Sequence, residues 1–194
     1  MSDLYLASAS PRRLELLSQL GLTCEVVPAH VDESRRPGEA PADYVVRLAR
    51  LKAETAAARL GRPEQPVLGA DTAVVVGGEV LGKPDDRDQG LTMLAKLSGR
   101  RHEVLSAVAL WSGRGVTSAL SLSRVRFRDI PVVEAGAYWD TGEPADKAGG
   151  YGIQGLGAVF VTELDGSYSG VMGLPLYETA ELLRAAGVDV LARK

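Results

Sequence analysis

A short apolar run at residues 4–7 breaks at Ser8, and a proline three residues later opens a helical pattern. Ser10 precedes Pro11, so we expect the serine at the N-cap and the proline at the first helical position, where a missing N–H costs no hydrogen bond. Gly21 is well placed to end that helix. The sequence therefore predicts a strand, a tight serine loop and a helix that begins where the strand ends.

Two arginines, Arg12 and Arg13, occupy the first turn of this predicted helix. The positive end of the helix dipole lies there, so helix stability does not explain two cations at this end. A bound polyanion does explain them, because helix N–H groups and guanidinium groups both bind phosphate. The alternative is an ordinary capped surface helix with solvated arginines, and this segment alone leaves both interpretations open.

The rest of the chain alternates between helical and strand patterns. We expect helices over residues 41–60, 86–97, 131–140 and 176–186, and strands over residues 23–28, 67–76, 79–81, 103–111, 116–127 and 158–164. Hairpin signals at residues 77–78 and 112–115 argue against a purely parallel doubly wound sheet. The pattern predicts an α/β fold with a mixed (parallel and antiparallel) central sheet and helices on both faces, in one domain over residues 1–194.

Composition excludes several classes of protein. The net charge is −3 with charges mixed along the chain, whereas a dedicated nucleic-acid binder usually carries a basic face. The single cysteine, Cys24, cannot form an intrachain disulfide and is expected in a half-buried strand, which fits a cytoplasmic location. We expect no membrane association, because no secretory signal pattern and no apolar run of about 20 residues occur.

Asp71 directly follows the apolar run of residues 67–70. A carboxylate at such a position is costly to bury unless it is paired or bound to a metal, although a turn or capping role is the plain alternative. Four other charged residues stand out in predicted loops and in the helix over residues 41–60: Glu33, Lys52, Lys83 and Lys147. Each alone is weak evidence for a functional site, because loop glutamates and helix lysines are usually solvated.

The combination of these residues is more specific than any one of them. Arginines, lysines and helix N–H groups suit a triphosphate, and one or two carboxylates suit Mg²⁺, which binds few protein carboxylates together with phosphate oxygens. The chain lacks the P-loop motif and a nucleophile elbow, and two histidines with one cysteine do not favour a zinc site. Residues 150–155 fit G-x-G-x-x-G as a string, but no helical pattern follows them, so a dinucleotide site is not expected.

Taken together, the motifs of this chain resemble those of the Maf family of nucleoside triphosphate pyrophosphatases. The resemblance runs in order over almost the whole chain, through residues 6–13, 44–49 with 52–53, 69–72, 82–84, 97–100, 146–149 with 151–155, and 173–176. It implies two lobes around a cleft (a fold of the Maf or ITPase type), a Mg²⁺ or Mn²⁺ cofactor, a nucleoside triphosphate substrate, and often a homodimer. Departures occur at residues 169–173 and at Ser106, where many members have other residues.

The resemblance also implies roles for individual residues. Asp71 would be the proton acceptor or a metal ligand, and Glu33 would help to hold the metal. The phosphates would be bound by Ser8, Ser10, Arg13, Lys52, Lys83 and Lys147.

Arg12, Thr72 and Gln154 match the branch of the family that prefers dTTP and UTP. This match implies that these three residues set substrate specificity, with Thr72 and Gln154 at the pyrimidine edge. Two alternatives remain open: the 7-methyl-GTP branch of the same family, and a nucleotide-binding regulator of cell division with little catalysis. The family also implies a house-cleaning role on modified pyrimidine nucleotides.

Overall fold

The computed structural model describes residues 2–191. Within these residues, a seven-stranded sheet has the order β2-β1-β3-β5-β6-β7, with β4 paired to β3. The strands are β1 (Leu4–Leu6), β2 (Cys24–Val26), β3 (Val67–Val76), β4 (Glu79–Leu81), β5 (Arg101–Ser112), β6 (Gly115–Phe127) and β7 (Val161–Asp165). β1 is parallel to β2 and β3, whereas the β3–β4 and β6–β7 pairs are antiparallel. The predicted mixed sheet is confirmed.

Helices alternate with these strands as the sequence predicts. They are α1 (Pro11–Gln19), α2 (Pro41–Arg59), α3 (Arg87–Leu97), α4 (Val132–Asp140), α5 (Tyr168–Met172) and α6 (Leu176–Ala185), with 3₁₀ helices η1 (Glu143–Asp146), η2 (Ala148–Gly150) and η3 (Leu156–Phe160). Gly21 follows the C-cap of α1 with a φ of +71°, a left-handed conformation that glycine adopts without steric cost. The predicted end of this helix is therefore confirmed.

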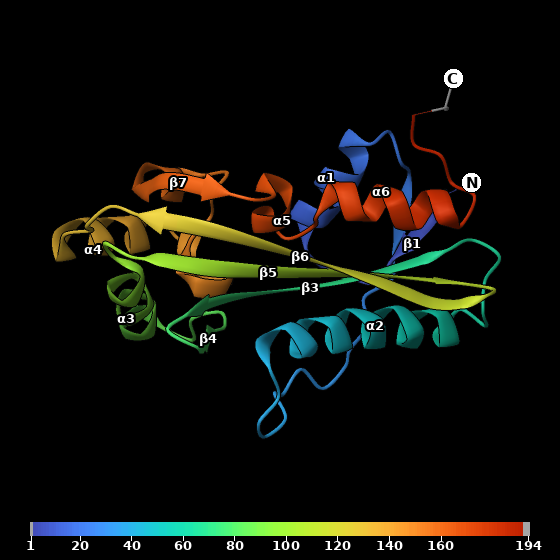
Figure 1. Ribbon diagram of the computed structural model, residues 1–194, viewed down its shortest axis with the longest axis horizontal. Coiled ribbons are helices and arrows are strands. Elements are labelled where there is room, and N and C mark those ends of the chain that lie inside the picture. Colours follow the sequence, from blue (N-terminus) through green and yellow to red (C-terminus); the bar gives the residue numbers. More distant parts are fainter. Residues whose placement is uncertain (1, 192–194) are drawn as a thin grey trace. The chain divides into compact units, whose positions relative to one another are not determined.

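The described residues fall into two compact units. The first contains those within Met1–Asp71, Ser106–Ser121 and Gly173–Lys194. In this unit α2 covers one face of the strands, and α1 and α6 cover the other (Figure 1). Small residues at Ala7, Ala56 and Ala57 pack with Val67, so α2 lies close to the sheet. Helices on both faces were predicted, and the first unit confirms them.

The second unit contains Thr72–Leu105 and Leu122–Met172. Its core is rich in leucine and aromatic residues, including Leu94, Leu97, Phe127, Tyr151 and Phe160. α3 and α4 lie side by side in this unit (Figure 1). Gly90 allows this close approach, because a Cβ at that position would lie 2.1 Å from Cζ3 of Trp139 in α4. The glycine that weakens α3 as a sequence pattern is thus required by its packing.

Two elements differ from the prediction. Residues 158–160 belong to η3 rather than to a strand, and pairing of β7 with β6 begins at Val161, opposite Phe127. The backbone amides of Leu156 and Gly157 in η3 donate to the Glu143 carboxylate, and these hydrogen bonds hold the segment in a turn. α5 was not predicted, because a five-residue helix is too short to show a period. Its first turn is held by Ser167, whose Oγ accepts from Gly170 N at 3.0 Å.

Among the described residues, no helix has the length and apolar character needed to cross a membrane.

Candidate active site

Asp71 lies inside β3, in the first unit, and is 7% exposed. The strand predicted over residues 67–76 is confirmed and runs through Asp71, so this residue lies within the strand and not in a loop at its end. Burial raises the pKa of this carboxyl, and the nearby charge and hydrogen bond of Lys52 partly oppose the rise. A raised pKa makes the ionised carboxylate a stronger proton acceptor than an ordinary aspartate.

Lys52 is the partner that makes burial of Asp71 tolerable. Its ammonium donates to Asp71 Oδ1 at 2.7 Å and lies 2.8 Å from Glu33 Oε1. Lys52 is itself buried on α2, whereas the Glu33 side chain is 57% exposed. Two carboxylates from different segments therefore converge on one ammonium, and the structure brings together three residues that the sequence could only suggest separately.

A glycine sets the distance between α2 and β3. A Cβ at Gly69 would lie 2.2 Å from the carbonyl oxygen of Ala49 and 2.7 Å from the amide nitrogen of Ala53. Both contacts are with the backbone of α2, so no side-chain movement could relieve them. Gly69 precedes Asp71 by two residues, and Ala53 follows Lys52. The close approach of strand and helix therefore places the Lys52 ammonium on the Asp71 carboxylate.

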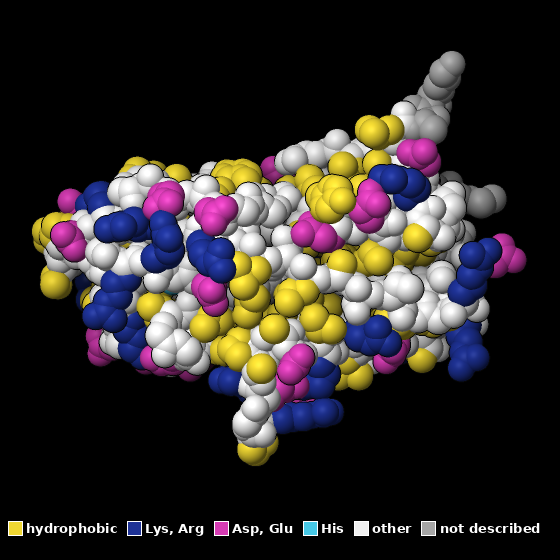
Figure 2. Space-filling view, in the orientation of Figure 1, with side chains coloured by type: hydrophobic (Ala, Val, Ile, Leu, Met, Phe, Trp, Pro, Cys, Tyr) yellow, Lys and Arg dark blue, Asp and Glu magenta, His cyan; other side chains and the backbone are white. Residues whose placement is uncertain are grey.

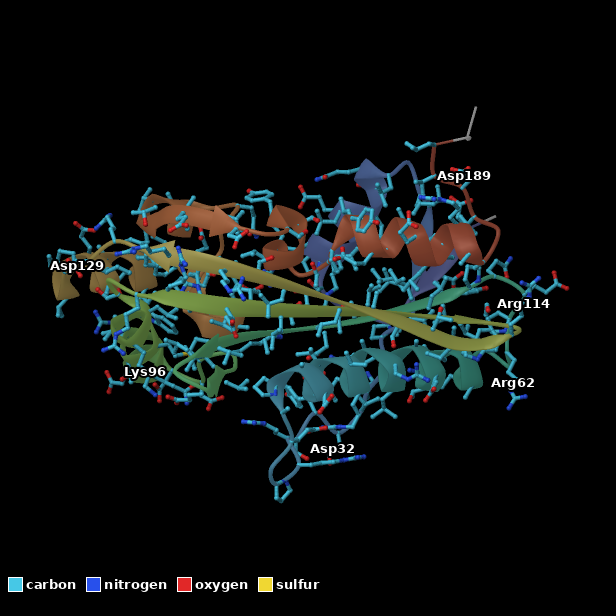
Figure 3. The ribbon with its side chains drawn as sticks, viewed as in Figure 1. Asp32, Arg62, Lys96, Arg114, Asp129 and Asp189 are labelled. Atoms are coloured by element: carbon cyan, nitrogen blue, oxygen red, sulfur yellow. The ribbon has the colours of Figure 1, made fainter. Side chains whose placement is uncertain are left out.

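The loop that carries Glu33 is attached to α2. Tyr44 Oη donates to the carbonyl oxygen of Glu33 at 2.9 Å, and Arg47 Nη2 donates to that of Ser34 at 3.1 Å. Arg47 also makes a paired contact with Glu39, Nε to Oε1 at 2.5 Å and Nη2 to Oε2 at 2.8 Å. The neighbouring Asp32 is labelled in Figure 3, where this loop lies next to α2. Sequence reasoning did not assign roles to Tyr44, Arg47 or Glu39.

Arg13 connects the start of α1 to the Asp71 strand. Its Nη1 donates to the carbonyl oxygen of Ala70 at 2.8 Å and to Ser8 Oγ at 3.1 Å, and its Nε donates to the carbonyl oxygen of Gly173 at 2.9 Å. Burial lowers the pKa of Arg13, and the charge of Asp71 opposes this effect. Arg13 thus fixes the residue next to Asp71, in addition to bringing positive charge to the helix start.

The two serines of the first motif have different positions. Ser8 is buried, and its Oγ accepts from the backbone N–H of Ser10 at 3.2 Å. Ser10 occupies the N-cap position of α1 as predicted, but its side chain makes no capping hydrogen bond. Arg12, in the first turn of α1, is partly exposed. The anion-binding interpretation of this helix start stays a prediction.

The remaining predicted site residues belong to the second unit, which begins at Thr72. Lys83 and Gln154 are exposed. Lys147 Nζ donates to Asp146 Oδ1 at 2.7 Å and to the carbonyl oxygen of Glu143 at 2.6 Å. Their joint action with Asp71 stays a prediction.

Glu143 is a residue that the sequence analysis missed. Its carboxylate accepts from Leu156 N at 2.8 Å, from Gly157 N at 3.1 Å and from Tyr138 Oη at 2.7 Å. Burial would raise the pKa of Glu143, but these hydrogen bonds and the charge of Lys147 outweigh it and lower the pKa. The only sequence signal is an acid in a turn, and such acids are common.

Glu33 and Asp71 are the residues that could hold a divalent cation. No group of three or more His, Cys, Asp or Glu side chains forms a metal site within residues 2–191. A site of two carboxylates still fits Mg²⁺, which commonly takes one or two protein carboxylates and completes its shell with water and phosphate oxygens. In this structure each carboxylate contacts the Lys52 ammonium through one oxygen, Glu33 Oε1 and Asp71 Oδ1.

The whole chain is similar to proteins of known family. A family model described as Maf-like protein matches residues 3–186. A dTTP/UTP pyrophosphatase of Bordetella parapertussis is 56% identical over 194 residues, with 96% of this chain and 94% of that protein covered. One from Methylobacillus flagellatus is 52% identical over 190 residues, with 98% and 96% covered. Among solved structures, a dITP/XTP pyrophosphatase from Mycobacterium abscessus is 17% identical, with 95% of each chain covered and a TM-score of 0.43.

Proposed function

The chain belongs to the Maf-like protein family, and we propose that it hydrolyses dTTP and UTP to the nucleoside monophosphate and pyrophosphate. Relatives above 50% identity over nearly their full length carry the name dTTP/UTP pyrophosphatase, which supports this substrate class. The structural observation that carries the proposal is the buried Asp71, paired with Lys52 and facing Glu33 across the same ammonium. A protein that only binds nucleotides has no need of such a base.

Asp71 is the proton acceptor in the proposed reaction. Water attacks the α-phosphorus, its proton passes to the Asp71 carboxylate, and the bond between the α-phosphorus and the bridging oxygen breaks as pyrophosphate leaves. Lys52 holds the carboxylate in one orientation through its 2.7 Å contact with Oδ1. Arg13 holds the preceding residue through its contact with the Ala70 carbonyl oxygen. Fixed geometry of this kind contributes to catalysis by positioning the base for attack.

Glu33 and Asp71 would hold the divalent cation, Mg²⁺ or Mn²⁺. When bound, the cation would supply positive charge to the phosphate oxygens. Tyr44 and Arg47 contribute by fixing the backbone of the Glu33 loop.

The phosphates would contact the start of α1 through Ser8, Ser10 and Arg13, and the charge of Arg12 would add to the positive potential there. Further positive charge for the triphosphate would come from Lys52, Lys83 and Lys147. Figure 2 shows charges of both signs interspersed on the face in view, as expected for a protein whose basic residues serve a small anion rather than an extended polyanion.

Specificity for the pyrimidine would come from Thr72 and Gln154, with Arg12 contributing. A Gln side chain offers both a donor and an acceptor, which suits the edge of thymine or uracil. The role in the cell would be cytoplasmic removal of canonical or modified pyrimidine triphosphates, and the family resemblance implies a homodimer. The 7-methyl-GTP branch is the alternative within the family.

Pyrophosphate release from a panel of triphosphates, with and without Mg²⁺, tests the proposal. We expect dTTP and UTP to be the best substrates and the reaction to require the metal. A preference for 7-methyl-GTP would overturn the proposed substrate, and tight nucleotide binding without pyrophosphate release from any triphosphate would favour the regulatory alternative.

A further inference from the structure

Gln154 lies in a glycine-rich segment, residues 152–155. The side chains of Tyr138 and Glu143 hold this segment at its two ends. Tyr138 Oη accepts from Gly152 N at 3.0 Å, at the start of the segment. Glu143 accepts from Leu156 N and Gly157 N at 2.8 and 3.1 Å, just beyond its end. Tyr138 Oη also donates to Glu143 Oε1 at 2.7 Å, so the two side chains form one network. All of these residues lie in the second unit.

Two glycines, Gly155 and Gly157, lie in close contact with the same pair of side chains. A Cβ at Gly155 would lie 2.3 Å from Glu143 Oε2, and a Cβ at Gly157 would lie 2.6 Å from Tyr138 Oη. Neither glycine has the positive φ that would require it on conformational grounds. Residues 150–155 fit a dinucleotide-binding string, but close approach to Glu143 explains Gly155 without any bound phosphate.

The pair is also anchored on its other side. Tyr138 is buried and packs edge-on against Phe160, with ring centroids 5.2 Å apart. Lys147 Nζ donates to the Glu143 carbonyl oxygen at 2.6 Å. Gln154, by contrast, is exposed. Between the two fixed ends, Gln154 is therefore presented to solvent on a loop whose backbone has little freedom.

We propose that Glu143, oriented by Tyr138, is a positioning residue that sets nucleobase selectivity by fixing the backbone of the loop that presents Gln154. The inference rests on the proposed function, because it assigns Gln154 to reading the base. A rigid loop keeps the Gln154 amide in one orientation, so that bases with the wrong donor and acceptor pattern leave it unpaired. Glu143 is not among the residues proposed for proton transfer or for holding the cation, so we expect its replacement to act through the loop rather than on the chemical step.

Glu143→Gln and Tyr138→Phe test this inference, with Glu163→Gln as the matched control. Glu163 is an exposed acid of the same unit that pairs with Arg101 Nη2 at 2.7 Å. The readouts are the ratio of kcat/KM for dTTP to that for dCTP, the separate kcat and KM for dTTP, and amide hydrogen exchange over residues 152–157.

For Glu143→Gln we expect faster exchange at Leu156 and Gly157, and a roughly tenfold fall in the dTTP-to-dCTP ratio, the factor that corresponds to losing one charge-assisted hydrogen bond. The effect should appear in KM, with kcat for dTTP near the wild-type value. Tyr138→Phe should speed exchange at Gly152 and lower the ratio in the same direction. The control should change neither exchange nor selectivity.

Unchanged selectivity together with faster exchange would show that the loop is fixed for other reasons, and unchanged exchange would show that Glu143 does not fix it; either result overturns the inference. If the wild-type protein releases no pyrophosphate from any triphosphate, the proposed function fails by itself. The exchange rates in the two variants would still decide whether Glu143 and Tyr138 hold the loop.

Discussion

The ammonium of Lys52 lies 2.7 Å from Asp71 Oδ1, and both side chains are buried. Lys52 comes from α2 and Asp71 from β3, and they meet because Gly69 lets the helix backbone lie against the strand. An ion pair at this depth is not explained by stability alone, since burying two charges costs several kcal/mol per ion, of the order that their attraction returns. It provides a carboxylate of fixed position and perturbed acidity.

The pH profile of the wild-type protein should reflect the raised pKa of Asp71. A general base acts when it is ionised, so activity should be lost as the pH falls through that pKa. Because burial raises the pKa, we expect the acid limb of kcat/KM to lie above about 3.9, the ordinary value for aspartate. Initial rates with dTTP across the acid range measure it. A limb at or below the ordinary value would contradict the assignment.

Removing the ammonium should move this limb further. In Lys52→Met the charge and hydrogen bond that lower the pKa of Asp71 are gone, so the acid limb should shift to higher pH. Loss of one partner from a buried pair should also lower the free energy of unfolding by about 3–5 kcal/mol, measured by urea denaturation.

Lys96→Met is the matched control for this change. Lys96 pairs with Glu79 at 2.6 Å near the surface of α3 (Figure 3), so we expect its replacement to leave the acid limb in place. A Lys52→Met limb at the wild-type position would show that Lys52 does not control the ionisation of Asp71.

Arg13→Lys should be destabilising although it keeps the charge. Lysine cannot reproduce the forked contacts of Nε with the Gly173 carbonyl oxygen and of Nη1 with the Ala70 carbonyl oxygen. We expect a loss of about 1–3 kcal/mol in the free energy of unfolding, together with lower kcat. Arg114→Lys, in the turn between β5 and β6 (Figure 3), should stay within about 0.5 kcal/mol of wild type. Equal stability of the two variants would mean that the Arg13 contacts contribute nothing.

Much of the fold could be predicted because its signals are local. Gly21 and Pro11 mark the ends of α1, and the glycines at residues 77–78 mark the turn between β3 and β4. α5 and the 3₁₀ helix over residues 156–160 were missed. Their conformation depends on hydrogen bonds from Ser167 and Glu143, and no period in the sequence reports such bonds.

Asp71 could be predicted because a charge next to an apolar run is unusual. Lys52 and Glu33 could be predicted only as weak candidates, because lysines on helices and glutamates in loops are usually solvated. Their convergence depends on the packing of α2 against β3, which sequence patterns do not specify. The contacts of Arg13 could not be found either, since the Gly173 carbonyl oxygen is 160 residues away in the chain. Glu143 could not be found from the sequence because two of its three partners are backbone amides, which any residue can supply, and the third, Tyr138, is brought to it by the fold.

The most direct test is pyrophosphate release from dTTP by wild type and by Asp71→Asn, measured together with dTTP binding. Asp140→Asn, which changes an exposed residue at the end of α4, is the control. We predict that Asp71→Asn lowers kcat by about 100-fold or more while binding is retained, and that Asp140→Asn matches wild type. Near-normal turnover in Asp71→Asn would contradict the role of Asp71 as the catalytic base.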